Sequence, residues 1–110
     1  MASVKRVASV INLDPAGIAE YEQLHAATWP AVLAKISECN IRNYSIYRYG
    51  LLLFSYFEYV GDDMDGDMDL MGKDPTTQDW WAVCKPLQRP VDEVLEDEWW
   101  HSVPEIFHHD

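Results

Sequence analysis

The order in which strand-like and helix-like segments follow one another is the feature that most limits how this chain can fold. Residues 4–12 alternate in a rough two-residue period, and the Asp-Pro pair at 14–15 then signals the start of a helix. Over residues 15–38 the apolar side chains recur at three- and four-residue steps, the spacing of one helical face. Pro30 lacks a backbone donor, so we expect this helix to kink near Trp29 or to restart at Pro30.

Two strand-like segments follow with almost nothing between them. Residues 42–49 and 51–60 are rich in Tyr, Ile and Phe, and Gly50 alone separates them, which predicts a tight antiparallel hairpin. A second Asp-Pro pair at 74–75 then opens a predicted helix that fades between residues 86 and 90. No internal repeat and no domain linker appears along the chain.

A closing strand, expected over residues 103–108, completes the pattern. The element order is then β-α-β-β-α-β within a single domain spanning residues 1–110. This is the order of the ferredoxin-like α+β fold, in which an antiparallel sheet carries its helices on one face. The opposite face of such a sheet is apolar and needs cover, which a second sheet packed face to face would provide. We therefore predict a homodimer.

The acidic stretch 61–72 has Asp at alternate positions around a glycine, as a calcium-binding EF-hand loop does. However, a loop with Gly66 at its sixth position would begin at Gly61 and end at Gly72, where an Asp and a bidentate Glu are required. We therefore interpret residues 62–71 as a solvated, weakly helical surface segment.

Composition excludes several function classes. The formal net charge of −11 over 110 residues disfavours binding to nucleic acid or to anionic lipid. No apolar run is long enough to span a bilayer or to form a signal-peptide core, so we expect a cytoplasmic protein. Cys39 and Cys84 lack metal-ligand spacing and are expected to be reduced, and no metal is expected on the His-His-Asp end at 108–110.

The aromatic residues are more numerous than one small core hides comfortably. With five Trp, six Tyr and three Phe, some rings are expected to line a pocket or a subunit interface. Tyr21, His25 and Trp29 follow at four-residue steps and share one face of the first helix. This face is either an ordinary buried face with a hydrogen-bonded histidine at its edge, or one wall of a site with a titratable group.

Tandem tryptophans support the interpretation of this helical face as one wall of a site. Adjacent helical residues point about 100° apart, so one ring of a Trp-Trp pair can pack in the core while the other lines a cavity. Such pairs occur at 80–81 and 99–100. Aromatic faces beside a few hydrogen-bonding groups suit a sugar, whose C–H face lies on a ring while its hydroxyls pair at the edges.

These residues, with others in the same order along nearly the whole chain, resemble the L-rhamnose mutarotase family. The resemblance rests on Tyr21, His25, Trp29 and Pro30; Asn43, Tyr44, Ile46 and Tyr47; Leu51, Leu52 and Phe54; Trp80 and Trp81; and Glu105 to His108. It implies a dimeric α+β barrel of ferredoxin-like subunits that interconverts the α and β anomers of a neutral 6-deoxy hexose without a cofactor. The expected sugar is L-rhamnose, with L-fucose as the alternative.

By motif position the resemblance implies that Tyr21 and His25 lie in the pocket, with Asn43, Trp80 and Trp81 as sugar contacts. The chemistry also suits these residues, because ring opening needs a group that both donates and accepts protons near neutral pH. We therefore expect His25 to be the main acid/base and Tyr21 to hold a hydroxyl or relay the second proton. Asn43 offers the sugar both a donor and an acceptor.

Trp80 or Trp81 is expected to stack on the sugar, and Trp29 is included among the candidate substrate-binding residues. Two functions of other classes remain open on the same fold. One is a monooxygenase that handles haem or a quinone, and the other is a sugar-binding or purely dimerising module without catalysis.

Overall fold

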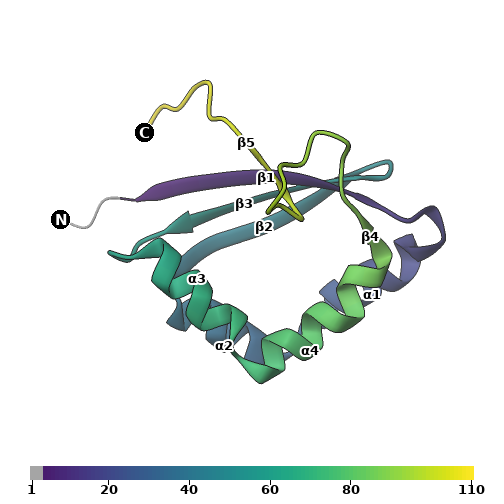
Figure 1. Ribbon diagram of the computed structural model, residues 1–110, viewed down its shortest axis with the longest axis horizontal. Coiled ribbons are helices and arrows are strands. Elements are labelled where there is room, and N and C mark those ends of the chain that lie inside the picture. The colour runs from purple at the N-terminus through teal and green to yellow at the C-terminus, as the bar shows by residue number, and fades with distance from the viewer. Residues whose placement is uncertain (1–3) are drawn as a thin grey trace.

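One antiparallel sheet forms a complete layer of the molecule (Figure 1). The computed structural model describes residues 4–110. The strand order is β2-β3-β1-β4, and β5 also pairs with β1. The strands are β1 (Lys5–Leu13), β2 (Ile41–Tyr49), β3 (Leu52–Tyr59), β4 (Gln88–Arg89) and β5 (His101–Val103).

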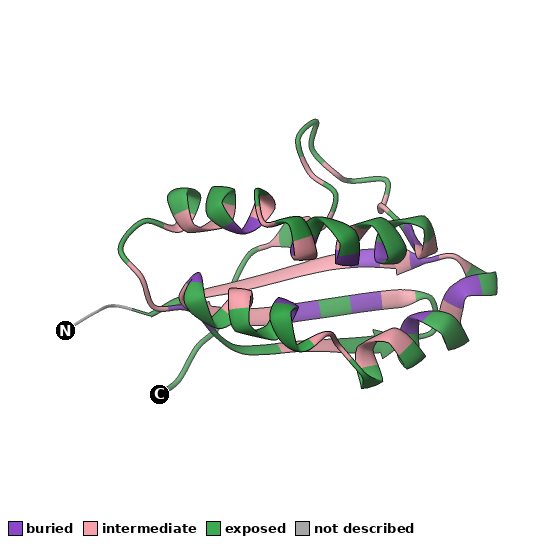
Figure 2. Cartoon of the chain, turned by 90° about the horizontal axis from the view of Figure 1, so that it is seen from below, coloured by how far each residue is buried: buried purple, intermediate pink, exposed green. Residues whose placement is uncertain are grey.

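Four helices lie over a single face of this sheet, as Figures 1 and 2 both show. They form two pairs, with α1 and α2 along one side and α3 and α4 along the other (Figure 2). The bounds are α1 (Ile18–Ala26), α2 (Pro30–Glu38), α3 (Met64–Gly72) and α4 (Pro75–Cys84). The predicted α+β fold with helices on one face is thus confirmed. Every helix within residues 4–110 is too short or too polar to cross a lipid bilayer.

Proline sets where the helices begin. The segment predicted over 15–38 is two helices, since α1 ends at Ala26 and Pro30 is the first residue of α2. A missing N–H is harmless at that position, because the first turn of a helix has no intrahelical partner for it. Pro75 opens α4 in the same way, and Asp74 caps this helix by accepting from the backbone N–H of Thr77 at 2.9 Å.

The acidic segment forms helix α3. Asp63 caps it by accepting from the backbone N–H of Gly66 at 3.1 Å. Met71 is buried, and both Met71 and Met68 pack against the small core cluster around Cys39. Asp65 and Asp69 stay exposed to water, whereas Asp67 is half-buried and accepts hydrogen bonds from Tyr59 and from Asn40, so it attaches α3 to the domain together with the methionines.

The predicted closing strand at 103–108 is wrong in its extent. Two short strands replace it, and both pair with β1: β4 with Asn12 and Leu13, and β5 with residues 8–10. Proline cannot donate to a ladder, so Pro90 ends β4 and Pro104 ends β5. The intervening residues leave the sheet as a loop.

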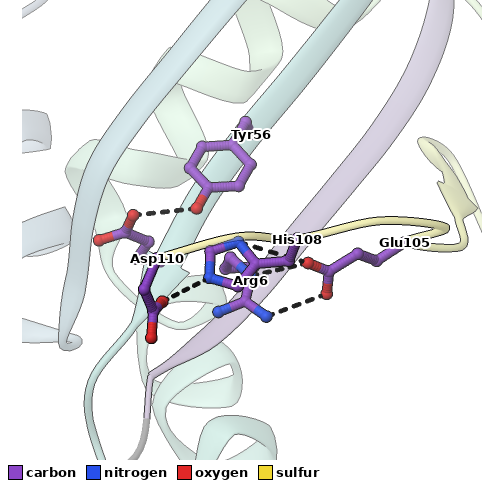
Figure 3. A network of polar contacts seen from close by, with 6 residues as sticks. Arg6, Tyr56, Glu105, His108 and Asp110 are labelled. Atoms are coloured by element: carbon purple, nitrogen blue, oxygen red, sulfur yellow. Dashed lines mark hydrogen bonds and ion pairs between the residues drawn. The ribbon is translucent and has the colours of Figure 1, made fainter.

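The C-terminal tail after β5 lies against the sheet face opposite the helices. Figure 3 shows the contacts there, where Arg6 Nε donates to Glu105 at 2.9 Å and His108 Nε2 lies 2.7 Å from Asp110. Tyr56 lies beside them on β3. Because these pairs are exposed, they add little to the stability of the fold.

The alternation of side chains divides the sheet into two unlike faces. The helix-facing side supplies Ile11, Leu13 and Leu53 to the main core, where they pack against side chains of α1, α2 and α4. The outer side leaves large rings in water, since Tyr47 is 64% and Phe54 is 38% exposed.

A β-bulge in β2 changes which side chains face the helices. The pairing of β2 with β3 shifts between Arg42 and Ser45, so that two residues of β2 oppose one of β3. Asn43 has the left-handed backbone that this bulge requires, with φ of 51°. An extra residue reverses the alternation, so Tyr44 lies on the helix-facing side and its ring centroid is 5.6 Å from that of Phe57.

The bulge can be tested by backbone preference alone. Asn43→Gly keeps the left-handed conformation, whereas Asn43→Val introduces a β-branched side chain that strongly disfavours it, and both lose the asparagine amide. In urea titrations, we expect the free energy of unfolding of N43V to be about 1–2 kcal/mol lower than that of N43G. Equal stability of the two variants would contradict the bulge geometry.

Candidate active site

A cavity opens between the helix-facing side of the sheet and the two helix pairs. It consists of two adjoining hollows of about 470 Å³ and about 330 Å³, a size suited to a small molecule. The residues that line both hollows come from α1, α2, β2 and α4 and are His25, Val32, Ile36, Ile41, Tyr44, Ile46 and Trp80. Most of the wall is therefore apolar, and a few polar groups converge on it.

Helix α1 brings the first two predicted site residues together. Tyr21 and His25 lie one helical turn apart, and their rings stack with centroids 4.2 Å apart and planes inclined by 24°. Tyr21 is buried, while His25 is half-buried and borders both hollows. The shared helical face predicted for Tyr21 and His25 thus places a phenol and an imidazole side by side in the cavity wall.

The hydrogen bonding of His25 defines its tautomer. Its Nδ1 lies 2.9 Å from the backbone carbonyl oxygen of Tyr21. A carbonyl can only accept, so the proton resides on Nδ1 and the lone pair of Nε2 is free. Burial is the main cause that lowers the pKa of His25 below its ordinary value of 6.5, so the ring is neutral at neutral pH. The imidazole is therefore prepared as a base.

The Tyr21 hydroxyl belongs to a buried chain of hydrogen bonds. It accepts from Gln88 Nε2 at 3.0 Å, and Gln88 Oε1 in turn accepts from the indole N–H of Trp99 at 2.7 Å. Burial raises the pKa of Tyr21 well above its ordinary value, which keeps the phenol protonated. Gln88 was not among the predicted site residues, because a single glutamine in a two-residue strand carries no sequence signal.

Tyr44, rather than Asn43, presents its side chain to the cavity. Tyr44 stays partly exposed at the mouth, but its hydroxyl lies inside, where burial raises its pKa. Asn43 borders the larger hollow, but its amide nitrogen donates to Glu58 Oε1 at 2.7 Å, on the outer side of the sheet. Strict alternation from Ile41 points Asn43 inward, and the bulge reverses this.

The predicted tryptophans occupy different layers around the cavity. Trp80 is buried and lines both hollows, with its ring centroid 5.2 Å from that of His25. Trp81 borders the smaller hollow. Trp29 lies behind Trp80, edge to face, with ring centroids 5.1 Å apart. It therefore supports the cavity wall by packing against Trp80 and does not itself line either hollow.

A short loop delivers the second tryptophan pair, Trp99 and Trp100, to the smaller hollow. Glu98 holds this loop, because its carboxylate accepts from the backbone N–H groups of Leu95 at 2.9 Å and Ser102 at 3.2 Å. These bonds, with the neighbouring His101 side chain, lower the pKa of Glu98 to about 2. The loop therefore keeps its charged anchor throughout the physiological pH range.

Lys85 and Cys84 also border the smaller hollow. Lys85 Nζ lies 5.5 Å from the ring centroid of Trp81 and 5.8 Å from that of Trp99, so the cation bridges two indoles at the edge of the smaller hollow. Cys84 is a buried free thiol whose pKa burial raises to about 11, which makes it unreactive. Within residues 4–110, no three His, Cys, Asp or Glu side chains lie together as a metal site requires.

The chain is similar to known sugar mutarotases. The family model described as L-rhamnose mutarotase matches residues 6–109. An L-rhamnose mutarotase of Bacteroides thetaiotaomicron is 35% identical, over 97% of this chain and 100% of its own. An L-fucose mutarotase of Xanthomonas campestris pv. campestris is 31% identical, over 96% of this chain and 88% of its own.

Two solved structures share the fold. An L-rhamnose mutarotase of Formosa agariphila superimposes with a TM-score of 0.72 at 18% identity, covering 96% of this chain and 99% of that one. The tetracenomycin F2 cyclase of Streptomyces glaucescens, a type-II polyketide cyclase, gives a TM-score of 0.69 at 17% identity, covering 96% and 97%. One backbone thus carries different chemistries, so the side chains of the cavity must decide the activity.

The protonation state of His25 can be measured directly by NMR. We expect its ring to titrate below 6.5 in the folded protein, with the neutral form carrying its proton on Nδ1. In concentrated urea the midpoint should return to about 6.5, because unfolding rehydrates the ring. His25→Asn identifies the resonance. A folded-state midpoint above 6.5, or a neutral ring protonated on Nε2, would contradict the proposed tautomer and burial.

Proposed function

Because the chain belongs to the L-rhamnose mutarotase family, we propose that it interconverts the α and β anomers of a 6-deoxy hexose, with L-rhamnose as the preferred sugar. The observation that carries this proposal is the pairing of a neutral His25, with a free Nε2, and a protonated Tyr21 hydroxyl on one wall of the cavity. Ring opening of a sugar needs a base and an acid on neighbouring oxygen atoms, and these two groups provide them.

In the proposed mechanism, His25 Nε2 accepts the proton of the anomeric hydroxyl while the Tyr21 hydroxyl donates to the ring oxygen. The bond between C1 and the ring oxygen breaks, and C1 becomes an aldehyde carbon. Rotation about the C1–C2 bond presents the other face of the aldehyde to the former ring oxygen. Closure reverses both proton transfers, since His25 returns its proton to the anomeric oxygen and Tyr21 recovers its own. The high pKa of Tyr21 favours this recovery.

The aromatic and aliphatic walls of the cavity suit the proposed sugar substrate. The Trp80 ring, which forms part of both hollows, is the surface on which we propose the C–H face of the sugar stacks, with Trp81 at the edge. Asn43 stays a proposed contact at the rim. The aliphatic wall formed by side chains such as Val32 and Ile46 offers the 6-methyl group an apolar surface.

L-Fucose is the second candidate substrate, because one relative at 31% identity is described as an L-fucose mutarotase. The two sugars differ in the configuration of their C2 and C4 hydroxyls, so a few polar contacts decide between them. Measuring anomer exchange of both sugars under the same conditions separates these alternatives.

Saturation-transfer NMR of the anomeric protons tests the function. We expect the protein to accelerate exchange of L-rhamnose more than that of L-fucose. His25→Ala should lower the catalysed rate by about 10²-fold or more, because it removes the proton acceptor. His109→Ala, in the exposed tail, is the matched control and should keep the wild-type rate. Exchange of both sugars unaffected by the protein would exclude the proposed function, and a fully active H25A would exclude the role of His25.

The pH dependence follows from the same histidine. Nε2 must be unprotonated to act, and burial lowers the pKa of His25, so the rate should be constant above pH 7 and fall as pH drops through the folded-state pKa, which lies below 6.5. The midpoint of this decline should coincide with the NMR titration of His25. A rate that is flat between pH 5 and pH 8 would remove this residue from the mechanism.

A second copy of the chain is the proposed partner of the outer sheet face. Tyr47, Tyr49 and Phe54 are 64%, 78% and 38% exposed on that side, and large exposed rings gathered on one face are typical of an interaction surface. An isologous pairing of two sheets would bury it. The reducing cytoplasm is the proposed compartment, in keeping with two buried unbridged thiols.

Sedimentation velocity tests this partner. We expect the wild type to sediment as a dimer at micromolar concentration and Phe54→Asp to sediment as a monomer, since a charge would be buried in the interface. Leu70→Asp, at a residue that is 47% exposed on α3, over the opposite face of the sheet, should stay dimeric. A monomeric wild type would overturn the proposed pairing.

A further inference from the structure

Gln88 is an unusual residue for its position. It begins β4, next to the end of β1, and it is 5% exposed. A buried primary amide is unfavourable unless its groups are paired, and Gln88 pairs both ends of its amide with side chains rather than with backbone. Both partners, Tyr21 and Trp99, border the cavity.

The chemistry of these partners determines the direction of every bond in the chain. An indole N–H can only donate, so Trp99 requires the carbonyl oxygen of Gln88 on its side, at 2.7 Å. The amide nitrogen is then directed at Tyr21, 3.0 Å from the phenol oxygen. Tyr21 therefore accepts from Gln88, and its own proton must be donated elsewhere.

The cavity is where that proton can go. No acceptor for the Tyr21 hydroxyl proton occurs among the side chains and backbone groups of residues 4–110, while Tyr21 itself lines the smaller hollow. A phenol without Gln88 could rotate freely and present its lone pairs instead of its proton. The fixed amide removes that freedom before a ligand arrives.

We propose that Gln88 is the positioning residue that holds Tyr21 as a hydrogen-bond donor toward the ring oxygen of the sugar, with Trp99 fixing the orientation of the Gln88 amide. This inference rests on the proposed function for its catalytic meaning. The direction of the Tyr21 hydrogen bond, however, follows from the geometry alone. Gln88 acts through Tyr21 and transfers no proton itself.

Gln88→Glu reverses the direction of the hydrogen bond with Tyr21 while the shape of the side chain stays almost the same. A carboxylate still accepts from Trp99, but it also accepts from Tyr21, so the phenol proton turns away from the cavity. We expect kcat for anomer exchange to fall about tenfold or more at pH 8, while KM changes less. The ratio of variant to wild-type activity should rise as pH falls, because the protonated carboxyl donates to Tyr21 again. Gln88→Met, which removes both hydrogen bonds at similar volume, should lower kcat without that pH-dependent recovery.

A double mutant separates positioning from a general loss of structure. In a Tyr21→Phe background, Gln88→Glu should cause little further loss, since the hydroxyl through which it acts is gone. Ser55→Ala is the matched control, because Ser55 is also 5% exposed and bonds only to Ser9, at 2.7 Å, so its loss should leave kcat unchanged. A Q88E protein with wild-type kcat at every pH, or equal losses in the two backgrounds, would overturn the proposal.

A spectroscopic measurement distinguishes failure of this inference from failure of the proposed function. The Fermi-resonance doublet of tyrosine in ultraviolet Raman spectra reports whether a phenol accepts or donates, and subtraction of the Tyr21→Phe spectrum isolates Tyr21. We expect an accepting phenol in the wild type and a donating one in Q88E; Q88M should lose the accepting signature. An unchanged spectrum in the folded variants would overturn the inference even if the wild type proves to be an active mutarotase. If the spectra change as expected but the wild-type protein does not accelerate anomer exchange, the direction of the Tyr21 hydrogen bond stands and only its catalytic role is refuted.

Discussion

The indole of Trp80 holds the two helix pairs in contact across the sheet, and the cavity depends on that contact. Its ring meets His25 of α1 at 5.2 Å and Trp29, just before α2, at 5.1 Å, although it belongs to α4. A large rigid ring at this point joins the pairs without letting them close completely on the sheet. The ring whose burial stabilises the fold therefore also forms part of the cavity wall, beside His25 and Tyr21.

The same apolar surroundings determine the charge state of the site. Burial lowers the pKa of His25 and raises that of Tyr21, so both side chains are neutral in the resting protein. Two hydrogen bonds set the orientation of the polar groups beside them: the carbonyl of Tyr21, which can only accept, pairs with His25 Nδ1, and the indole N–H of Trp99, which can only donate, pairs with Gln88 Oε1. A neutral base and a neutral acid thus lie in contact in the resting protein.

Local periodicity predicted the features that depend on local chemistry. The element order, the restart of the helix at Pro30 and the shared face of Tyr21 and His25 follow from backbone rules that act over a few residues. The closing strand was predicted too long, although the proline that ends it was visible in the sequence. The exchange of Asn43 for Tyr44 in the cavity depends on a bulge, which changes pairing between strands and leaves no local pattern. The role of Gln88 depends on partners remote in sequence, so no spacing rule could find it.

The last strand is divided into two pieces that are fastened independently to β1, with Pro90 and Pro104 ending the pieces. The segment between them carries Trp99 and Trp100 into the cavity, but it contributes nothing to the ladder itself. The sheet therefore does not set the length of this segment, whereas Trp99 and Glu98 within it are held by their hydrogen bonds to Gln88 and to the loop backbone. A change in the length of the loop ahead of Glu98 would therefore reshape one wall of the smaller hollow without shifting the register of the sheet or separating Tyr21 from His25 on α1.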